Sequence, residues 1–197
     1  MASERWSTTD GIGGDTSIEH HSNAGWRRGA DGDPRLAAEL EGCVGDDAIV
    51  LHGRTASTVR GDIDHLVIAS SGVWIVDAKN YWGVVERRDV GNWRKADRRL
   101  FVNGRDETES VANMTWQAEA VRAVLDPIGF GDVPVHPVLL FVGSGGRWFL
   151  QPIEIGGVRA VWAKQLTELV SVPGPIDRAA VSAIAAQLDA MLPVASS

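Results

Sequence analysis

Two apolar runs separated by a short polar break constrain the fold of this chain more than any other feature. The runs cover residues 63–69 and 73–79, and both are rich in the β-branched and aromatic residues that are typical of strands. Ser70, Ser71 and Gly72 lie between them and are typical of a tight turn. The segment therefore predicts a β-hairpin with Ser70 and Ser71 as its two-residue loop.

A loop of that length also predicts the pairing of acidic residues across the hairpin. It brings Asp64 directly opposite Asp77, and opposed residues have Cβ atoms roughly 4.5–5.5 Å apart. Two like charges so close repel each other unless a cation lies between them, and Mg²⁺ often binds through one or two carboxylates. Lys79 projects from the same face as Asp77 because side chains alternate along a strand. This arrangement suits metal-assisted hydrolysis of a phosphodiester.

The same residues also allow a plainer interpretation. The expected register places Asp62 opposite Lys79, where the two would form an ordinary cross-strand ion pair. Asp64 would then begin the strand, and Asp77 would be a solvated residue at its end. The spacing alone leaves both interpretations open. His65 alternates to the face opposite Asp64, so we expect it to be structural.

The remaining elements follow from apolar spacing and from residues that favour turns. Helices are expected at residues 33–41, 110–125 and 176–192. Strands are expected at residues 48–52, 63–69, 73–79, 83–86, 135–142 and 158–162. The first helix would have Asp33 as its N-cap and Gly42 as its stop, whereas the last would carry Ala180, Ile184, Leu188 and Met191 on one apolar face.

Composition limits the classes of protein to which the chain can belong. Its single cysteine, Cys43, excludes an intramolecular disulfide framework and a cysteine-based zinc cluster. Residues 1–25 are polar and aperiodic, so we expect a disordered tail there and one domain over 26–193. No apolar run approaches the ~18 residues of a membrane helix, and the N-terminal region lacks a secretory core. These features favour a cytoplasmic protein without a membrane partner.

Basic residues concentrate in one segment of a chain whose net charge is −7. Residues 86–105 hold an excess of arginine and lysine, and this stretch reads as a loop. The candidates for nucleic-acid contacts there are Arg94, Lys95, Arg98 and Arg99. Trp82 and Trp93 flank the segment and would stack on bases or pack in the core. The alternative is a solvated loop whose arginines offset nearby acids.

Three motifs together resemble one known family. They are Gly-Ala-Asp-Gly-Asp at 29–33, Asp-Ile-Asp-His-Leu-Val-Ile at 62–68, and Gly-Val-Trp-Ile-Val-Asp-Ala-Lys-Asn at 72–80. This pattern resembles the nuclease-related domain, NERD, which is itself similar to the PD-(D/E)xK nuclease superfamily. The resemblance covers residues 29–125. It implies an α/β fold of the restriction-endonuclease type, with a mixed β-sheet flanked by helices.

The resemblance also implies roles for individual residues. Asp64 and Asp77 would be ligands of Mg²⁺ or Mn²⁺, and Lys79 would be the catalytic lysine. Asp33 stands where the family usually has glutamate, so it would be a third, shorter ligand. Gln117 falls where related nucleases carry a glutamine that faces the site, although it also fits a polar residue on a helix flank. The expected function is a metal-dependent nuclease acting on DNA. The alternative is a non-catalytic module that keeps the fold and binds nucleic acid or a separate protein partner.

Overall fold

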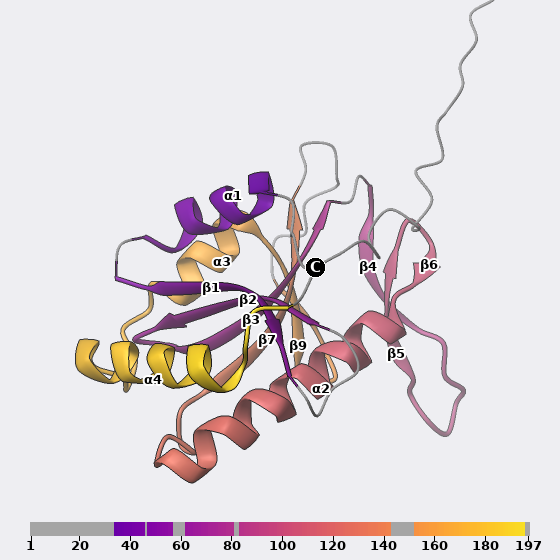
Figure 1. Ribbon diagram of the computed structural model, residues 1–197. Coiled ribbons are helices and arrows are strands. Elements are labelled where there is room, and N and C mark those ends of the chain that lie inside the picture. The colour runs from indigo at the N-terminus through magenta and orange to yellow at the C-terminus, as the bar shows by residue number, and fades with distance from the viewer. Residues whose placement is uncertain (1–33, 46, 57–61, 81–82, 143–151, 196–197) are drawn as a thin grey trace, which may run out of the picture.

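A six-stranded mixed sheet forms the centre of the computed structural model (Figure 1). The structure describes residues 34–45, 47–56, 62–80, 83–142 and 152–195. In sheet order, the strands are β1 (Ile49–Thr55), β2 (Asp62–Ala69), β3 (Gly72–Asn80), β7 (Val135–Val142), β9 (Val158–Trp162) and β8 (Ile153–Ile155). Pairing is antiparallel from β1 to β3, parallel from β3 through β7 to β9, and antiparallel again between β9 and β8. The expected α/β class with a mixed sheet is therefore confirmed.

The β2–β3 hairpin has the register that its turn predicts. Ala69 pairs with Gly72, and the ladder continues to His65 opposite Val76. Ser70 and Ser71 form the loop. One step beyond the last pair of the ladder, the same register sets Asp64 opposite Asp77.

Other parts of the chain hold the hairpin turn in place. The Ser71 hydroxyl donates a 2.8 Å hydrogen bond to the carbonyl of Val170 and accepts one from the indole N–H of Trp74. The backbone N–H of Ile176 donates to the carbonyl of Ser70. A Cβ added at Gly174 would lie 2.2 Å from that carbonyl oxygen, so only glycine fits there without a shift. The turn that sets the register is thus clamped by residues about one hundred positions later.

Helices cover both faces of the central sheet. They are α1 (Pro34–Val44), α2 (Thr108–Leu125), α3 (Ala163–Val170) and α4 (Arg178–Met191), and a short 3₁₀ turn, η2 (Asp126–Ile128), follows α2. Figure 1 shows α1 and α3 on one side of the sheet and α2 and α4 on the other. Each side has its own apolar core, and Leu40 and Leu166 belong to the first core, whereas Met114 and Ile184 belong to the second. None of the helices in the described ranges is long and apolar enough to cross a membrane.

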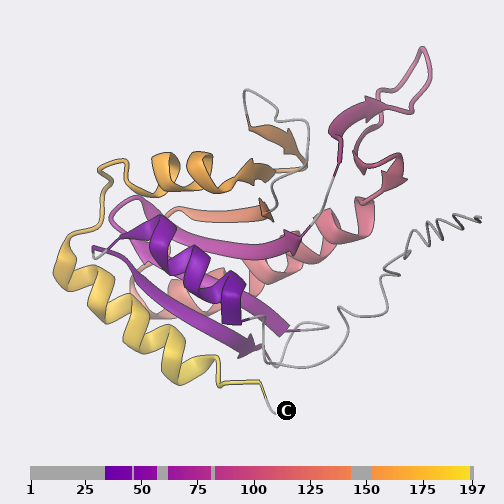
Figure 2. The same ribbon diagram turned by 90° about the horizontal axis from the view of Figure 1, so that it is seen from above.

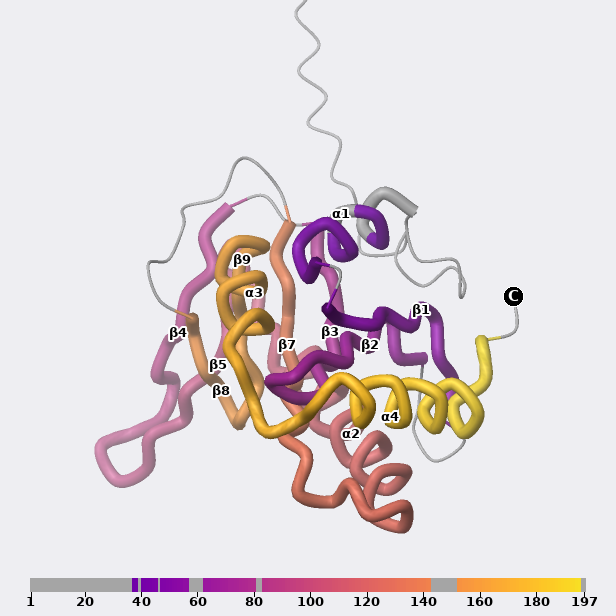
Figure 3. The backbone as a smooth tube through the Cα atoms, turned by 90° about the vertical axis from the view of Figure 1, so that its left-hand side faces the viewer, coloured from indigo at the N-terminus to yellow at the C-terminus, as the bar shows by residue number. Residues whose placement is uncertain are grey.

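The basic segment is a second, three-stranded antiparallel sheet. It consists of β4 (Val85–Asp89), β5 (Arg98–Val102) and β6 (Arg105–Asp106). The strand expected at 83–86 is present as β4, although it begins at Val85 and belongs to this small sheet. The expectation that 86–105 is a loop was wrong, because β5 and part of β4 lie within it. Val85, Leu100 and Val102 are buried in the core on the α2 side, and this burial makes strands of a mostly charged sequence. The β4–β5 hairpin projects away from the central sheet (Figures 2 and 3).

Several element ends differ from the expected ones. α1 continues past Gly42, because Val44 is buried in its last turn, and Gly45 with φ of 72° follows the helix. Met191 is exposed and does not continue the apolar face of α4. β8 and α3 were not expected from the sequence. The expected tail, Asp33 and Trp82 lie outside the described residues.

Candidate active site

The structure brings Asp64 and Asp77 together where β2 and β3 diverge from their ladder. The two carboxyl groups lie close enough for each to shift the pKa of the other. Both lie on the face of the sheet that α2 covers, because Asp77 follows Ile75 by two positions and Ile75 belongs to the core on that side. The juxtaposition expected from the turn is thus present in the folded chain.

Lys79 lies on the same face and pairs with Asp77. Its ammonium nitrogen is 2.8 Å from Oδ2 of Asp77, and the two side chains are only 21 % and 14 % exposed. The carboxylate of Asp62 instead accepts a 2.9 Å hydrogen bond from Thr55 on the neighbouring strand β1. Lys79 therefore pairs with Asp77 of the acidic pair, and, among the described residues, the cross-strand ion pair with Asp62 does not form.

The electrostatics of the acidic pair are strained. Burial raises the pKa of Asp77 to about 6, and the nearby charge of Asp64 adds to the rise, although Lys79 opposes it. Desolvation also raises the pKa of Asp64, and contacts with Asp77 and Lys79 offset this only in part. One lysine does not compensate two crowded carboxylates. Carboxyl groups perturbed in this way cluster at functional sites.

Gln117 of α2 reaches the same corner of the sheet. Its side-chain amide donates a 3.1 Å hydrogen bond to the backbone carbonyl of Asp62, at the start of β2. Its Oε1 atom is buried and has no hydrogen-bond partner among the described residues. Buried Val111 and Met114 anchor the preceding turns of the helix in the core. Gln117 is thus fixed beside the strand that bears Asp64, with an acceptor oxygen still available.

The residues present fit a hard divalent cation. Oδ1 of Asp77 is buried and receives no hydrogen bond from any described residue, which is costly for a carboxylate oxygen. Two oxygen-bearing side chains with excess negative charge match the one or two carboxylates through which Mg²⁺ commonly binds. The described residues contain no group of three or more His, Cys, Asp or Glu side chains that could hold a metal. The third expected ligand, Asp33, lies outside them.

His65 belongs to the opposite face, as its alternation predicts. Its Nδ1 is 2.8 Å from Nδ1 of His52 on β1, and Nε2 of His52 is 3.1 Å from a carboxylate oxygen of Glu41 on α1. Burial, reinforced by His52, lowers the pKa of His65 to about 4, so this ring is neutral near pH 7. The chain of contacts joins α1 to the sheet. The sequence did not reveal it, because it depends on the β1–β2 register that pairs the two histidines.

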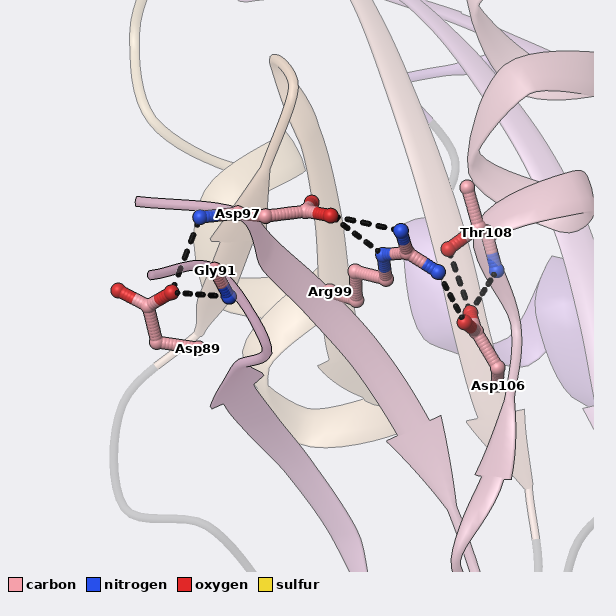
Figure 4. A network of polar contacts seen from close by, with 6 residues as sticks. All are labelled: Asp89, Gly91, Asp97, Arg99, Asp106 and Thr108. Carbon is pink, nitrogen blue, oxygen red and sulfur yellow. Dashed lines mark hydrogen bonds and ion pairs between the residues drawn. The ribbon is translucent and has the colours of Figure 1, made fainter. Parts of the chain in front are cut away.

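The basic residues expected to contact nucleic acid occupy two kinds of position. Arg94 and Lys95 lie in the loop between β4 and β5, and Arg98 begins β5. Arg99 instead bridges two carboxylates, with a nitrogen 2.6 Å from Asp97 and another 2.9 Å from Asp106 (Figure 4). This network escaped the sequence-based prediction, because nothing in the spacing shows that β6 returns beside β5.

Comparison with known families gives one match. The model of the nuclease-related domain, NERD, matches residues 28–142. That range is more than half of the 197 residues, and it includes the β2–β3 hairpin, the three-stranded sheet and α2. Comparisons with curated proteins and with solved structures found no match. The chain therefore belongs to the nuclease-related domain family.

Proposed function

We propose that this protein is a metal-dependent phosphodiesterase that cleaves nucleic acid, with DNA as its expected substrate. One observation carries the proposal: two carboxyl groups meet at the end of the β2–β3 hairpin, and Oδ1 of the more buried one, Asp77, has no described partner. An uncompensated site of this kind gains stability when it binds a cation. Membership of a nuclease-related family supports the same chemistry.

Asp64 and Asp77 would hold Mg²⁺ or Mn²⁺, and Asp33 is the third expected ligand. Either cation, when bound, supplies Lewis acidity toward a phosphate and lowers the pKa of bound water. The ammonium of Lys79 adds positive charge beside the carboxylates, where it neutralises charge that develops on the phosphate or orients the attacking water. The buried, unpartnered Oε1 of Gln117 is an acceptor that can orient a ligand or water at the same corner.

A cleavage assay tests this proposal. The full chain is incubated with single-stranded DNA, double-stranded DNA and RNA, each in Mg²⁺, Mn²⁺ or EDTA. We expect cleavage in Mg²⁺ or Mn²⁺, none in EDTA, and none by an Asp77→Asn variant. Cleavage that persists in EDTA or in the variant would place the activity in a contaminant or at another site.

A second candidate function has an observation of its own. The ion pair between Lys79 and Asp77 neutralises one carboxylate without a metal, as a structural site would. In that case the chain is a non-catalytic module that binds nucleic acid or a protein partner. The same assay separates the two functions when Mn²⁺-dependent thermal stabilisation is measured alongside it, because a non-catalytic module would show neither cleavage nor stabilisation by the metal.

A further inference from the structure

The loop between β4 and β5 exposes a large aromatic side chain. Trp93 is 86 % exposed, although tryptophan is usually largely buried in a folded protein. The guanidinium carbon of Arg94 lies 4.4 Å from the centre of its ring. The indole thus has a cation against one face, while most of its surface is open to a ligand.

The cations of this hairpin divide into a paired and an unpaired set. Arg88 pairs with Glu86 and lies over the ring of Phe101, and Arg99 is held by Asp97 and Asp106. Four other basic side chains form no ion pair within the described part of the chain. They are Arg87, Arg94, Lys95 and Arg98. Arg94 and Lys95 lie in the loop, Arg98 begins β5 opposite Asp89, and Arg87 lies in the middle of β4. Three of these four cations are therefore in or next to the loop that carries Trp93.

Hydrogen bonds fix the shape of this loop. Asp89 accepts from the backbone N–H groups of Gly91 and Asp97, as Figure 4 shows. The side chain of Asn92 accepts from the backbone N–H groups of Arg94 and Lys95. These bonds hold the backbone on both sides of Trp93. A preformed loop loses less conformational entropy when it binds a ligand.

We infer that the β4–β5 hairpin is an arm that binds single-stranded nucleic acid. An unpaired base stacks on Trp93 next to Arg94, and Arg87, Lys95 and Arg98 contact the phosphates. Stacking on an exposed aromatic ring within a positively charged surface is the common mode of binding to single strands. Bases inside a duplex are already stacked on one another, so an isolated indole favours an unpaired base.

The position of the arm relates it to the candidate active site. α2 begins with Thr108, two residues after the end of β6, and carries Gln117, which donates to the backbone carbonyl of Asp62 near Asp64 on β2. Nine residues of helix span roughly 14 Å. A strand held at the arm therefore approaches Asp64 and Asp77 along α2. The inference rests on the proposed function for the class of its ligand, whereas the binding itself requires no catalysis.

Fluorescence anisotropy tests the inference with the full chain in EDTA, where no cleavage is expected. The probe is a labelled oligothymidylate or oligouridylate on the order of 15 nucleotides long, compared with a duplex of the same length. We expect Trp93→Ala to weaken binding to the single strand about tenfold. Trp93→Leu keeps an apolar side chain but removes the ring, so it should weaken binding similarly, and binding should quench the tryptophan fluorescence of the wild type only.

The charge of the arm is tested with a matched pair of variants. Lys95→Ser/Arg98→Ser should flatten the dependence of log affinity on log salt concentration by about 1.4, since each phosphate contact on a single strand contributes roughly 0.7. Lys164→Ser/Arg178→Ser removes the same charge from exposed positions on α3 and α4 and should leave the slope unchanged. Equal flattening in both variants would overturn the inference, because it would report net charge only.

Other results would also overturn it. Wild-type affinity in Trp93→Ala or in Trp93→Leu excludes stacking, and tighter binding of the duplex than of the single strand excludes the proposed ligand. Failure of the proposed function looks different: no cleavage in Mn²⁺, combined with binding that depends on Trp93, removes hydrolysis and supports the arm. Cleavage with an unchanged KM in every arm variant overturns the arm and leaves the active site in place.

Discussion

Aspartate side chains have opposite pKa shifts in two regions of the molecule. The first is the acidic corner, where Asp64 and Asp77 meet at the end of the β2–β3 hairpin, and the second is the network of Asp97, Arg99 and Asp106 in the small sheet. Burial and a like charge raise the pKa of Asp77 to about 6. Hydrogen bonds from Thr108 and Arg99 lower the pKa of Asp106 to about 2. In the Arg99 network, donors surround the carboxylates, whereas at the acidic corner, where Asp77 is largely buried and Asp64 is exposed, donors are too few. The difference separates carboxylates that are satisfied within the structure from the pair that we propose binds a cation.

The largest effect that would test this comparison is the loss of cleavage activity when charged side chains of the acidic corner are removed. Asp77→Ala should reduce metal-dependent cleavage by on the order of 10³-fold or more, because it removes a ligand of the cation. Lys79→Ala should cause a comparable loss while leaving Mn²⁺ affinity nearly unchanged. Rates come from single-turnover cleavage, and affinities come from calorimetry. Equal loss of metal binding in both variants would make Lys79 a support for the carboxylates instead.

The dependence of the melting temperature on metal concentration gives a second test of the comparison. A cation that binds only the folded chain stabilises it by about 2.7 kcal/mol at a hundredfold excess over its dissociation constant. Mn²⁺ should therefore raise the melting temperature of the wild type but not that of Asp64→Ala/Asp77→Ala. Asp97→Ala/Asp106→Ala removes two carboxylates from the Arg99 network and should keep the full metal response. If both double variants respond as the wild type does, the cation binds elsewhere.

Neutralising Asp77 in the acidic corner should increase the free energy of unfolding when no metal is present. The folded pKa of Asp77 lies above its ordinary value of 3.8, so its ionisation opposes folding at neutral pH. Asp77→Asn should raise stability in EDTA by on the order of 1–3 kcal/mol above pH 6, and the gain should vanish as the pH falls toward 4. Thermal unfolding from pH 4 to 8 measures it. A variant less stable than the wild type at pH 8 would mean that the lysine ion pair outweighs desolvation.

Neutralising Asp106 in the Arg99 network should change stability least, and it should lower stability rather than raise it. The folded pKa of Asp106 is lowered, so its ionised form contributes stability above about pH 4, and this contribution is lost as the pH falls toward 2. Asp106→Asn should thus lower the melting temperature slightly at pH 7, with a smaller difference near pH 3. Asp132→Asn, at an exposed position before β7, is the control. A larger decrease at pH 3 than at pH 7 would contradict the assignment.

The sequence was most informative where local rules decide structure. The Ser70–Ser71 loop fixed the register of β2 and β3, and with it the meeting of Asp64 and Asp77. The apolar run of β7 gave that strand its observed bounds. These features depend on turn length and on burial of both faces, which are visible in a short stretch of residues.

The small sheet and its network could not be predicted from the same rules. β4 and β5 carry mostly charged side chains, and their strand structure depends on burial of Val85, Leu100 and Val102 beneath distant elements. The sequence pattern predicts the same role for Arg99 and Arg94, because both are arginines in one basic segment. Only the pairing of β5 with β6, next to Asp106, distinguishes an arginine held by carboxylates from one free to meet a phosphate.

The clamped turn of the β2–β3 hairpin has a consequence for how this protein can change over evolution. The turn lies six residues from Asp64, or about 20 Å along the strand, yet its length decides whether Asp64 meets Asp77. An insertion of one residue at Ser70 would shift one strand relative to the other and turn alternate side chains to the wrong face. A larger residue at Gly174 would press on the same turn. A lineage can therefore separate Asp64 from Asp77 while both residues and Lys79 stay intact, so an unchanged set of these residues is not sufficient to identify a homologue that keeps the proposed site.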